Sequence, residues 1–582
     1  MFRPNKRHIQ MQMLSTIDSL PEDQSKRLQE GWAGVFYQEF FSRVDEQPFA
    51  VLYSDKDSRP NIPINVLLGL EALKSGFNWS DEEMYDAFCF DLQVRYALGY
   101  RNLGEGQFDL RTVYNFRHRL NERMQQTGDD LIEKAFEHVT DQQISSFHLK
   151  TGKVRMDSSE IASNIRNMSR LHLLVEVVQR VHRMLSETDR TLYADTFAPY
   201  LRGTSGQYVY RVKGEDGPAH MQRIGELMGK LLKELAAYGG HPTYQILQRV
   251  FTEHFIVEQE RLRLKAGKEL SSASLQSPDD TEATFRKKNG RSYKGHVANV
   301  TETCHPENPF QLIAKIQAAP NVTNDDDMLI EAVPSLKKRL DINEVHTDGG
   351  YNSDESYQLL RENDINHVQT AIRGHSPTTR IGLDQFDIAR SDEDKPVQVT
   401  CPHGQTLTVE AGKGNERYIA HFDAEKCSTC PFQEKCPTRE LKREPYRTLH
   451  FDHHDAEIAR RRKRIAQDHQ DGCNLRVAIE STIASLKQPF NYDQLPVRGL
   501  FRVHVVLIGS AAMTNLRRIH RYIAGQRVDK GKTADKVALQ GTERTSTLFS
   551  PYSLARFFSC LRSLRRYVRP FNIRQRQSYA NC

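Results

Sequence analysis

The sequence lacks the segments that mark a membrane protein or an exported protein. It contains no apolar run of about 18 residues, the length at which a membrane-spanning helix becomes a candidate, and its first residues, MFRPNKRHIQMQML, contain no apolar stretch of a signal peptide. Cysteine is sparse, with nine in 582 residues, and tryptophan occurs only twice. We therefore expect a cytoplasmic protein without a membrane partner, in which the cysteines form no disulfide framework.

A large excess of one charge is missing as well. The 81 Lys and Arg residues against 75 Asp and Glu residues give a net charge of +6, which is too small over this length to indicate nucleic-acid binding by itself. The basic residues are concentrated in short stretches, however: RRRKR at residues 460–464, RKKNGRSYK at 286–294, and an arginine-rich stretch from Pro551 onward that has no Asp, Glu or Lys. Such stretches suit a polyanion better than the net charge does.

The length predicts several domains, because a single core stops growing at about 250–300 residues. We find no internal repeat of solenoid period. Residues 1–146 are predicted to form an all-α domain, since NVLLGLEALKSGFNW and DLRTVYNFRHRLNERM carry apolar residues at helical spacing, with Ser80 and Asp109 as N-caps. A DNA-binding helix-turn-helix and a plain helical bundle both fit this pattern. The helix around Tyr114 carries a basic surface that comprises Arg111, Arg117, His118 and Arg119.

Residues 147–525 are predicted to form an α/β domain with a mixed sheet. Its strands are expected in FHLKTGKVRMDSSEI, ending at Asp157, then in SYKGHVANVTETC, FQLIAKIQAAP, INEVHTDGG, ending at Asp348, and NHVQTAI. Helices are expected in DDDMLIEAVPSLKKRL and SDESYQLLREN. Two insertions interrupt this domain: residues 167–270, mainly helical and without strand signals, and the cysteine-rich residues 395–445. Residues 526–582 are predicted to form a linker and an arginine-rich tail.

Four cysteines lie close together in the second insertion. Cys401 lies in a CPHG turn, and Cys427, Cys430 and Cys436 lie in KCSTCPFQEKC. This spacing can place four thiolates around one metal ion, and it favours a structural zinc ion. An iron–sulfur cluster and the absence of any metal are alternatives, and His403 is an alternative fourth ligand.

The stretch CNLRVAIESTIASLKQ, residues 473–488, contains an unusual carboxylate. In a helix, Arg476, Glu480 and Lys487 share one face beside an apolar stripe. One interpretation is pairing of surface charges. The other is a catalytic carboxylate whose partners lie elsewhere in the chain.

Asp157 and Asp348 are the candidate partners, because each is predicted at the end of a strand. Together with Glu480 they can form a Mg²⁺ site, since hard cations prefer oxygen ligands. Two such ions about 3.5–4 Å apart promote phosphodiester displacement. Gly349 and Gly350, which follow Asp348, would allow the backbone to approach a metal or a phosphate closely. The residues alone do not decide the case, because the chain has 75 acidic residues.

The sequence resembles bacterial insertion-sequence transposases of the DDE class, whose catalytic core has the RNase H-like fold shared with retroviral integrases. The resemblance is carried by VRMDSSEIASN around Asp157, ATFRKKNGRSYKGH, and HTDGGYNS around Asp348. It is also carried by the signature Y-(2)-R-(3)-E-(6)-K, which Arg476, Glu480 and Lys487 fulfil, whereas Cys473 stands where the tyrosine is expected. The N-terminal helices and the cysteine-rich insertion also resemble this family, so that the similarity spans about residues 35–520.

The resemblance implies that Asp157, Asp348 and Glu480 are catalytic and hold two Mg²⁺ ions, with Mn²⁺ as a substitute. Arg476 and Lys487 would then meet DNA phosphates. The enzyme would bind the ends of an insertion sequence, cleave them with water and join the 3′-hydroxyls to target DNA, as a homodimer or higher oligomer on double-stranded DNA in the bacterial nucleoid. The basic stretch adds further candidate DNA contacts, namely Arg286, Lys287, Lys288 and Lys294.

Two other functions fit parts of the sequence. One is a transposase descendant that binds DNA but has lost catalysis, and the other is an iron–sulfur nuclease with an unrelated set of carboxylates. The remaining polar clusters are expected to be structural: residues 325–327 as a helix cap, residues 453–455 as a solvated first turn, Asp279 and Asp280 as loop residues, and Ser158 and Ser159 as local hydrogen-bonding groups.

Overall fold

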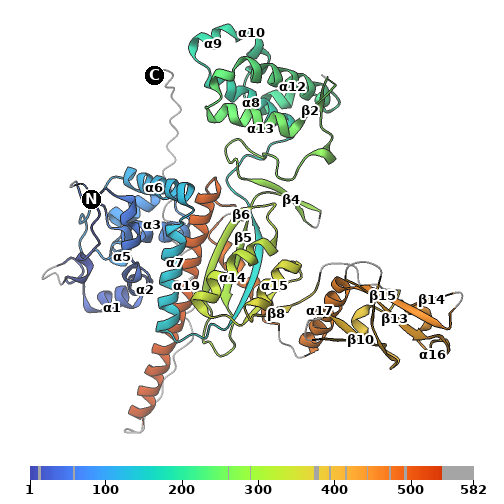
Figure 1. Cartoon of the computed structure of the whole chain (residues 1–582). Helices are drawn as coiled ribbons and strands as arrows, with labels where there is room; N and C mark the ends of the chain where they lie inside the picture. Colours follow the sequence, from blue (N-terminus) through green and yellow to red (C-terminus); the bar gives the residue numbers. More distant parts are fainter. Residues whose placement is uncertain are drawn as a thin grey trace. The chain divides into compact units, whose positions relative to one another are not determined.

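The structure is a computed structural model of the whole chain (Figure 1). It describes residues 1–10, 15–54, 56, 59–259, 261–288, 290–372, 379–391, 395–412, 416–441, 444–470, 474–490 and 494–539. The chain divides into two compact units, Met1–Tyr522 and Ile523–Cys582. Among the described helices, none is long and apolar enough to span a membrane.

A mixed sheet forms the centre of the first unit. Its strands are β1 (Lys153–Ile161), β5 (Arg291–Thr303), β6 (Ile313–Pro320), β7 (Glu344–Thr347) and β8 (Asn366–Gln369), in the order β6-β5-β1-β7-β8. The pairs β1/β5 and β5/β6 are antiparallel, whereas β1/β7 and β7/β8 are parallel. The predicted mixed α/β architecture is therefore confirmed.

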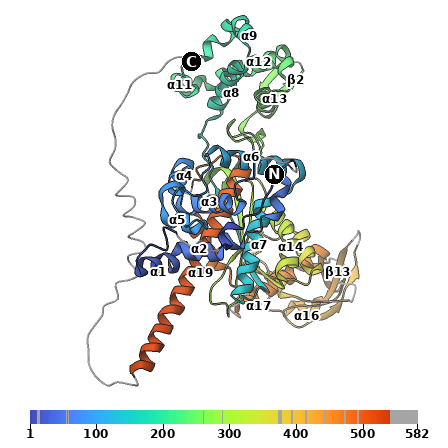
Figure 2. The same cartoon turned by 90° about the vertical axis from the view of Figure 1, so that its left-hand side faces the viewer.

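The helices that pack on this sheet follow the sequence pattern closely. Helix α14 (Asp325–Leu340) and helix α15 (Asp354–Glu362) lie where their apolar periodicity predicts them. Helix α19 (Leu500–Leu539) begins alongside β6 (Figures 1 and 2), where Asn515 and His504 bond the main chain of that strand. Residues 295–303 of β5 and 313–317 of β6 are buried without a break, and polar residues such as His296, Asn299 and Gln317 are buried among the apolar ones.

The predicted end of the first strand is wrong. Strand β1 continues past Asp157 to Ile161, because residues 158–161 remain paired with β5. Asp157 therefore lies in the middle of the central strand, opposite Val300. Ser158 and Ser159, expected to be local hydrogen-bonding groups, are half-buried strand residues whose hydroxyls bond to the distant Asp325 and Lys487. Asp348, in contrast, directly follows β7 as predicted.

Up to Ser146 the described elements are all helices, among them α4 (Asp81–Phe90), α6 (Arg111–Thr127) and α7 (Leu131–Ser146). Ser80 caps α4 in a reciprocal capping box with Glu83, as the sequence predicts. The predicted basic surface of α6 is smaller than expected. Arg117 turns inward and donates to Glu71 and Asp81 at 2.6 and 2.8 Å, so it does not face solvent as the helix pattern suggested.

The first insertion contains the helices α8 (Arg170–Met184), α12 (Gly217–Glu234) and α13 (Pro242–His254), which enclose their own apolar core. The prediction that no strand occurs here is wrong. Strands β2 (Phe255–Glu258) and β3 (Arg261–Leu264) form an antiparallel hairpin after α13. Each strand has only four residues, too few for the alternating pattern to stand out from the adjacent helical periodicity.

The cysteine-rich insertion forms small antiparallel sheets around a core that includes Phe386, Val399, Phe422 and Leu449. The sheets comprise β9 (Asp387–Arg390), β10 (Pro396–Thr400), β11 (Thr406–Thr408), β12 (Glu410–Ala411), β13 (Arg417–Asp423), β14 (Arg439–Glu440) and β15 (Tyr446–Asp452). Helix α17 (His453–Gln470) follows them.

Residues 526–539, which were predicted to belong to a linker, continue helix α19 as far as Leu539. Extending an existing helix costs little, and one glycine raises the free energy of a helix by only about 1 kcal/mol, so composition alone misplaced this boundary. Residues 540–582, including the arginine-rich stretch, lie outside the described residues.

Asp280, expected to be a loop residue, is buried and connects segments that are far apart in the sequence. Its carboxylate accepts from the Ser163 hydroxyl at 2.9 Å, His296 Nε2 at 3.1 Å and the Gly499 backbone N–H at 2.9 Å. Burial alone would raise its pKa, but the hydrogen bonds and the charge of His296 lower it to about 2. Loop residues 277–283 are thereby fixed to β1, β5 and the start of α19.

We predict that Asp280→Asn destabilises the protein. The folded pKa of about 2 lies below the unfolded value of about 3.9, so the ionised carboxylate stabilises the fold above about pH 4 and that stabilisation is lost as the pH falls toward 2. The free energy of unfolding should drop by about 2–3 kcal/mol at pH 7. Thermal melting of wild type and variant at pH 7 and pH 3.5 checks this, since the difference must shrink in acid. An equal difference at both pH values would contradict it.

Candidate active site

Asp157 is a buried carboxylate in the middle of β1. Its side chain is 9% exposed, and Arg476 Nη2 lies 2.8 Å from its Oδ2. Burial raises the pKa of Asp157, the Arg476 guanidinium lowers it and the Asp348 charge raises it, with a net increase. Asp157 and Asp348 therefore lie close enough to repel each other.

Asp348 is held by the turn that follows β7. Its Oδ1 accepts the backbone N–H of Gly350 at 2.7 Å, which closes a local turn. Gly349 is required by packing, because a Cβ there would lie 2.8 Å from the carbonyl oxygen of Ala371. In this structure the glycine thus allows close approach of the chain after β8.

Glu480 lies in the first turn of α18 (Ile479–Lys487), with its side chain 64% exposed. The single helix predicted over 473–488 is wrong, because Arg476–Ala478 form a 3₁₀ turn before α18 begins. Cys473, in the position of the expected tyrosine, lies outside the described residues. Even so, Arg476 Nη1 lies 3.4 Å from Glu480 Oε1, so the predicted i,i+4 pair is present.

Arg476 is the residue around which the carboxylates gather. Burial lowers the pKa of Arg476, but the charges of Asp157, Asp348 and Glu480 raise it by more. One guanidinium therefore compensates three acids that are far apart in the sequence. The structure brings all three predicted carboxylates to one place, at the face of β1 that α18 covers.

Lys487, the last residue of the predicted signature, is bound to the sheet. Its Nζ donates to the Ser159 hydroxyl at 2.8 Å and to the Glu160 carbonyl at 2.9 Å. These bonds fasten the end of α18 to β1. In this conformation Lys487 orients the helix, whereas the sequence suggested a contact to DNA.

The carboxylates have the chemistry of a Mg²⁺ site. Burial is the main cause of the raised pKa of Asp157, and the negative charge of Asp348 adds to it although Arg476 lowers it; a nearby cation would favour the ionised form. Among the described residues, however, no three His, Cys, Asp or Glu side chains are gathered closely enough to hold a metal as they stand. Arg476 lies between the carboxylates instead, so metal binding requires their side chains to rearrange around it.

Residues 400–520 match a family model described as a transposase DDE domain. This stretch is therefore similar to a transposase DDE domain. The matched residues include Arg476, Glu480 and Lys487 together with all four clustered cysteines, and they begin after Asp157 and Asp348. Neither a curated protein nor a solved structure matches the chain. The resemblance to DDE-class transposases is thereby confirmed, and domains of this kind use divalent metal ions.

A further set of buried polar groups lies near Asp157 and Asp348, and the sequence analysis did not identify it. Tyr351 is fully buried, and its hydroxyl donates to Asn299 Oδ1 at 2.8 Å. Burial and the charges of Asp325, Asp157 and Asp348 raise its pKa well above 10. Asp325, expected to be a helix cap, is buried and accepts the Ser158 hydroxyl at 2.6 Å.

The cap itself is made by a neighbouring residue. Asn324 and Asp327 form the capping box of α14, which confirms a capping role for one of the three acids. Asp326 instead accepts from the Ser353 N–H and the Ser356 hydroxyl, at the start of α15. No periodicity in the sequence distinguishes these three aspartates.

Four predicted DNA contacts lie on a two-stranded ribbon. Strand β4 (Thr284–Lys288) pairs with the first residues of β5, whereas β1 pairs with β5 only from His296 onward. Between these two regions, Gly295 has a φ of +143°, and a Cβ there would lie 2.4 Å from the carbonyl oxygen of Ile161. Within the ribbon, Lys287 is exposed, Arg286 is partly exposed, Lys288 lies 3.4 Å from Glu160, and Lys294 donates to the Met168 carbonyl.

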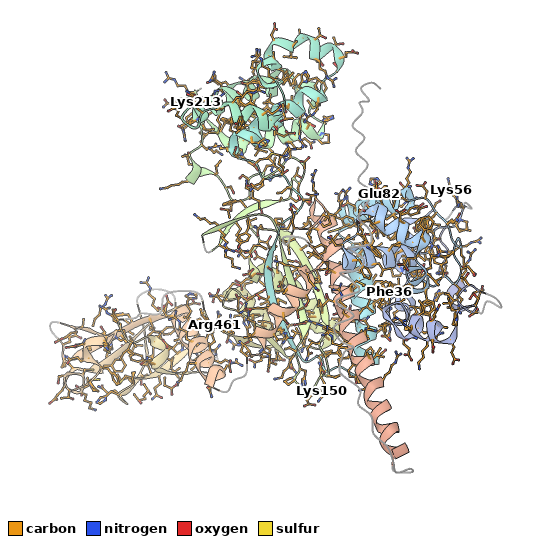
Figure 3. All side chains as sticks on the ribbon, turned by 180° about the vertical axis from the view of Figure 1, so that it is seen from behind. Phe36, Lys56, Glu82, Lys150, Lys213 and Arg461 are labelled. Carbon is orange, nitrogen blue, oxygen red and sulfur yellow. The ribbon has the colours of Figure 1, made fainter. Side chains whose placement is uncertain are left out.

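Several residues of the RRRKR run, 460–464, contact other parts of the protein. Arg461, labelled in Figure 3, is 6% exposed, and its guanidinium lies 3.8 Å from the centroid of the Tyr357 ring. Arg460 donates to Glu457 and Tyr357, and Lys463 lies 2.8 Å from Asp387. These contacts fix α17 to its neighbours, while Lys463 and Arg464 remain exposed on its surface.

The four clustered cysteines line one small cavity of about 20 Å³, together with His403. Cys401 Sγ accepts the Gln405 backbone N–H at 3.3 Å, and Cys436 Sγ accepts the Thr438 hydroxyl at 3.3 Å. Burial raises the pKa of Cys427, and the nearby Cys436 and Cys401 contribute to the increase. The four sulfurs share this cavity, but as they stand no three of these described cysteines are close enough together to hold a metal ion.

We predict that Asp157→Asn raises the melting temperature of the metal-free protein at pH 7. The raised pKa means that the ionised carboxylate costs stability above the folded pKa, and the neutral amide removes this cost. The gain should shrink as the pH falls and wild-type Asp157 becomes protonated. Thermal melting over a pH series measures the effect, with Asp280→Asn as the buried aspartate that must lower the melting temperature. A lower melting temperature for Asp157→Asn would refute the prediction.

Proposed function

We propose that the protein is a DNA transposase that binds the ends of an insertion sequence, cleaves them by metal-dependent hydrolysis and joins the 3′-hydroxyls to target DNA. The observation that carries this proposal is the gathering of Asp157, Asp348 and Glu480 around Arg476. The DDE domain match supports the transposase class. The sheet of three antiparallel strands continued by two parallel strands supports an RNase H-like core.

Asp157, Asp348 and Glu480 would hold two Mg²⁺ ions, or Mn²⁺ in their place. Ions bound there activate the attacking oxygen and stabilise the leaving oxygen of an in-line phosphodiester displacement. Arg476 has the further role of meeting the scissile phosphate, because its guanidinium presents several N–H donors that match phosphate oxygens. The bonds from Lys487 to β1 keep α18, and hence Glu480, aligned with Asp157.

The remaining segments have proposed roles in DNA handling. Residues 1–146 would recognise the transposon ends, and residues 147–525 would form the catalytic domain, with insertions at 167–270 and 395–445. The ribbon residues Arg286, Lys287, Lys288 and Lys294 would contact phosphates, which makes binding strongly salt-dependent. Because two ends must be joined to one target, a homodimer or higher oligomer would assemble on the DNA.

The reaction can be tested on DNA that carries the element's own ends. We expect wild type to cleave and join these ends with Mg²⁺ or Mn²⁺, and we expect Asp157→Asn, Asp348→Asn and Glu480→Gln each to lower the rate by at least about 10³-fold. Each substitution removes a ligand charge while nearly preserving shape, so end binding in a mobility-shift assay should survive.

Lys463→Gln is a matched control, because Lys463 pairs with Asp387 on the surface of α17, away from the carboxylates. It should cleave like wild type. Wild type that binds ends but never cuts with either metal would favour the noncatalytic function. A carboxylate variant that cuts as fast as wild type would remove that residue from the site.

We also predict that the purified protein contains about one zinc ion per chain, held by Cys401, Cys427, Cys430 and Cys436. Elemental analysis measures it, and Cys427→Ser should lose the zinc and lower the melting temperature, because metal binding stabilises a small insertion with little core of its own. Cys304→Ser, at a buried cysteine outside the cluster, should keep the zinc. A brown protein that absorbs visible light would instead indicate an iron–sulfur cluster.

A further inference from the structure

Glu302 is a fully buried carboxylate on β5, beside the candidate active site. It lies directly opposite Arg155 of β1, whose Nε donates to Glu302 Oε1 at 2.7 Å. Side chains two residues apart in a strand point to the same face, so Arg155 shares a face of the sheet with Asp157. Glu302 is thus anchored on the face that carries the first catalytic aspartate.

The same carboxylate holds the segment that carries Glu480. The Thr482 hydroxyl, two residues beyond Glu480 in α18, lies 2.8 and 2.9 Å from the two oxygens of Glu302. Arg155, fixed by Glu302, donates through Nη1 to the Leu475 carbonyl at 3.1 Å, one residue before Arg476. Glu302 therefore fixes both ends of the short stretch from Leu475 to Thr482.

A third partner comes from α19. Arg518 Nη1 donates to Glu302 Oε2 at 2.7 Å and to the Gln311 carbonyl at 3.0 Å, and its Nη2 contacts the Thr482 hydroxyl. Two guanidinium groups and one hydroxyl thus converge on one carboxylate without access to water. If the carboxylate of Glu302 moved away, Arg155 and Arg518 would be left without a negative partner, which is energetically costly. The hydrogen bonds therefore hold these groups in fixed positions.

We propose that Glu302 is a positioning residue for the metal-dependent reaction, which sets the distance of Glu480 and Arg476 from Asp157. This inference rests on the proposed transposase function. The side chain of Glu480 is 64% exposed, so its position depends on the helix that carries it. Groups that orient metal ligands in this way commonly change metal affinity by about 10- to 100-fold when they are replaced.

The test compares Glu302→Gln and Thr482→Val with Asp280→Asn in the full-length protein. Asp280 is a matched control, since it is also a buried carboxylate bonded to β5 but contacts neither α18 nor Arg155 through its hydrogen bonds. The measurements are the Mg²⁺ concentration that gives half-maximal cleavage, the affinity for end DNA, the melting temperature, and amide hydrogen exchange of residues 475–487 without metal.

We expect Glu302→Gln to need about tenfold more Mg²⁺ and Thr482→Val to shift in the same direction by less, with end binding unchanged. Both should speed exchange in residues 475–487. Asp280→Asn should lower the melting temperature while the Mg²⁺ requirement and the exchange of that segment stay as in wild type. If Glu302→Gln does not fold, Thr482→Val decides the matter, because it keeps the carboxylate and both arginines.

A Mg²⁺ requirement and exchange pattern like wild type in the folded variants would overturn the proposal, even if their melting temperatures fell. Wild type that cuts with neither Mg²⁺ nor Mn²⁺ would instead overturn the proposed function. In that case the exchange of residues 475–487 still shows whether Glu302 holds the segment, so the two failures are distinguishable.

Discussion

The arrangement of side chains around β1 depends on how the negative charges of nearby carboxylates are compensated. Burial raises the pKa of Asp157 most, and the nearby negative charge of Asp348 raises it further. A single guanidinium, from Arg476, offsets this charge and also reaches Glu480. Whatever keeps Arg476 in place therefore keeps the acids together. The 3₁₀ turn at its root, the bonds of Lys487 to β1 and the buried Glu302 all act on that segment. The site is thus a balance between the negative charges of the carboxylates and the positive charge of Arg476.

Local patterns in the sequence predicted much of the fold, because periodicity reflects burial on one face. The mixed sheet, α14, α15 and the position of Asp348 after β7 followed from it. The misses share a physical cause. The continuation of β1 past Asp157 depends on pairing with β5, and the inward turn of Arg117 depends on Glu71, 46 residues away. Glu302 and Asp280 looked ordinary because their partners come from segments that no local pattern connects. For the candidate site, the sequence predicted the residue types and their spacing. It did not predict the electrostatic interaction of Arg476 with all three carboxylates.

The basic residues show how little a run of charge says by itself. In α17, Arg461 is buried against the ring of Tyr357, and the partly exposed Arg460 donates to Glu457. The ribbon of β4 and β5 differs in kind, since it extends beyond the part of the sheet that β1 pairs and begins at a glycine that no other residue could replace without a clash. A flat, two-stranded element of this size is one of the shapes that a DNA groove accepts. Whether an arginine is structural or available to a partner depends on its burial and its contacts, more than on the number of basic residues near it.

The wide separation of the site residues along the chain has a consequence for synthesis. Asp157 and Glu480 are 323 positions apart (480 − 157), and Arg476 comes almost as late. At about 5–20 residues per second, the ribosome finishes the second half of the site roughly 16–65 s after the first. A partial chain thus carries a repelling pair of aspartates without the arginine that offsets them. The proposed DNA cleavage needs Glu480 and Arg476 as well as the two aspartates, so a chain that ends before residue 476 would lack it.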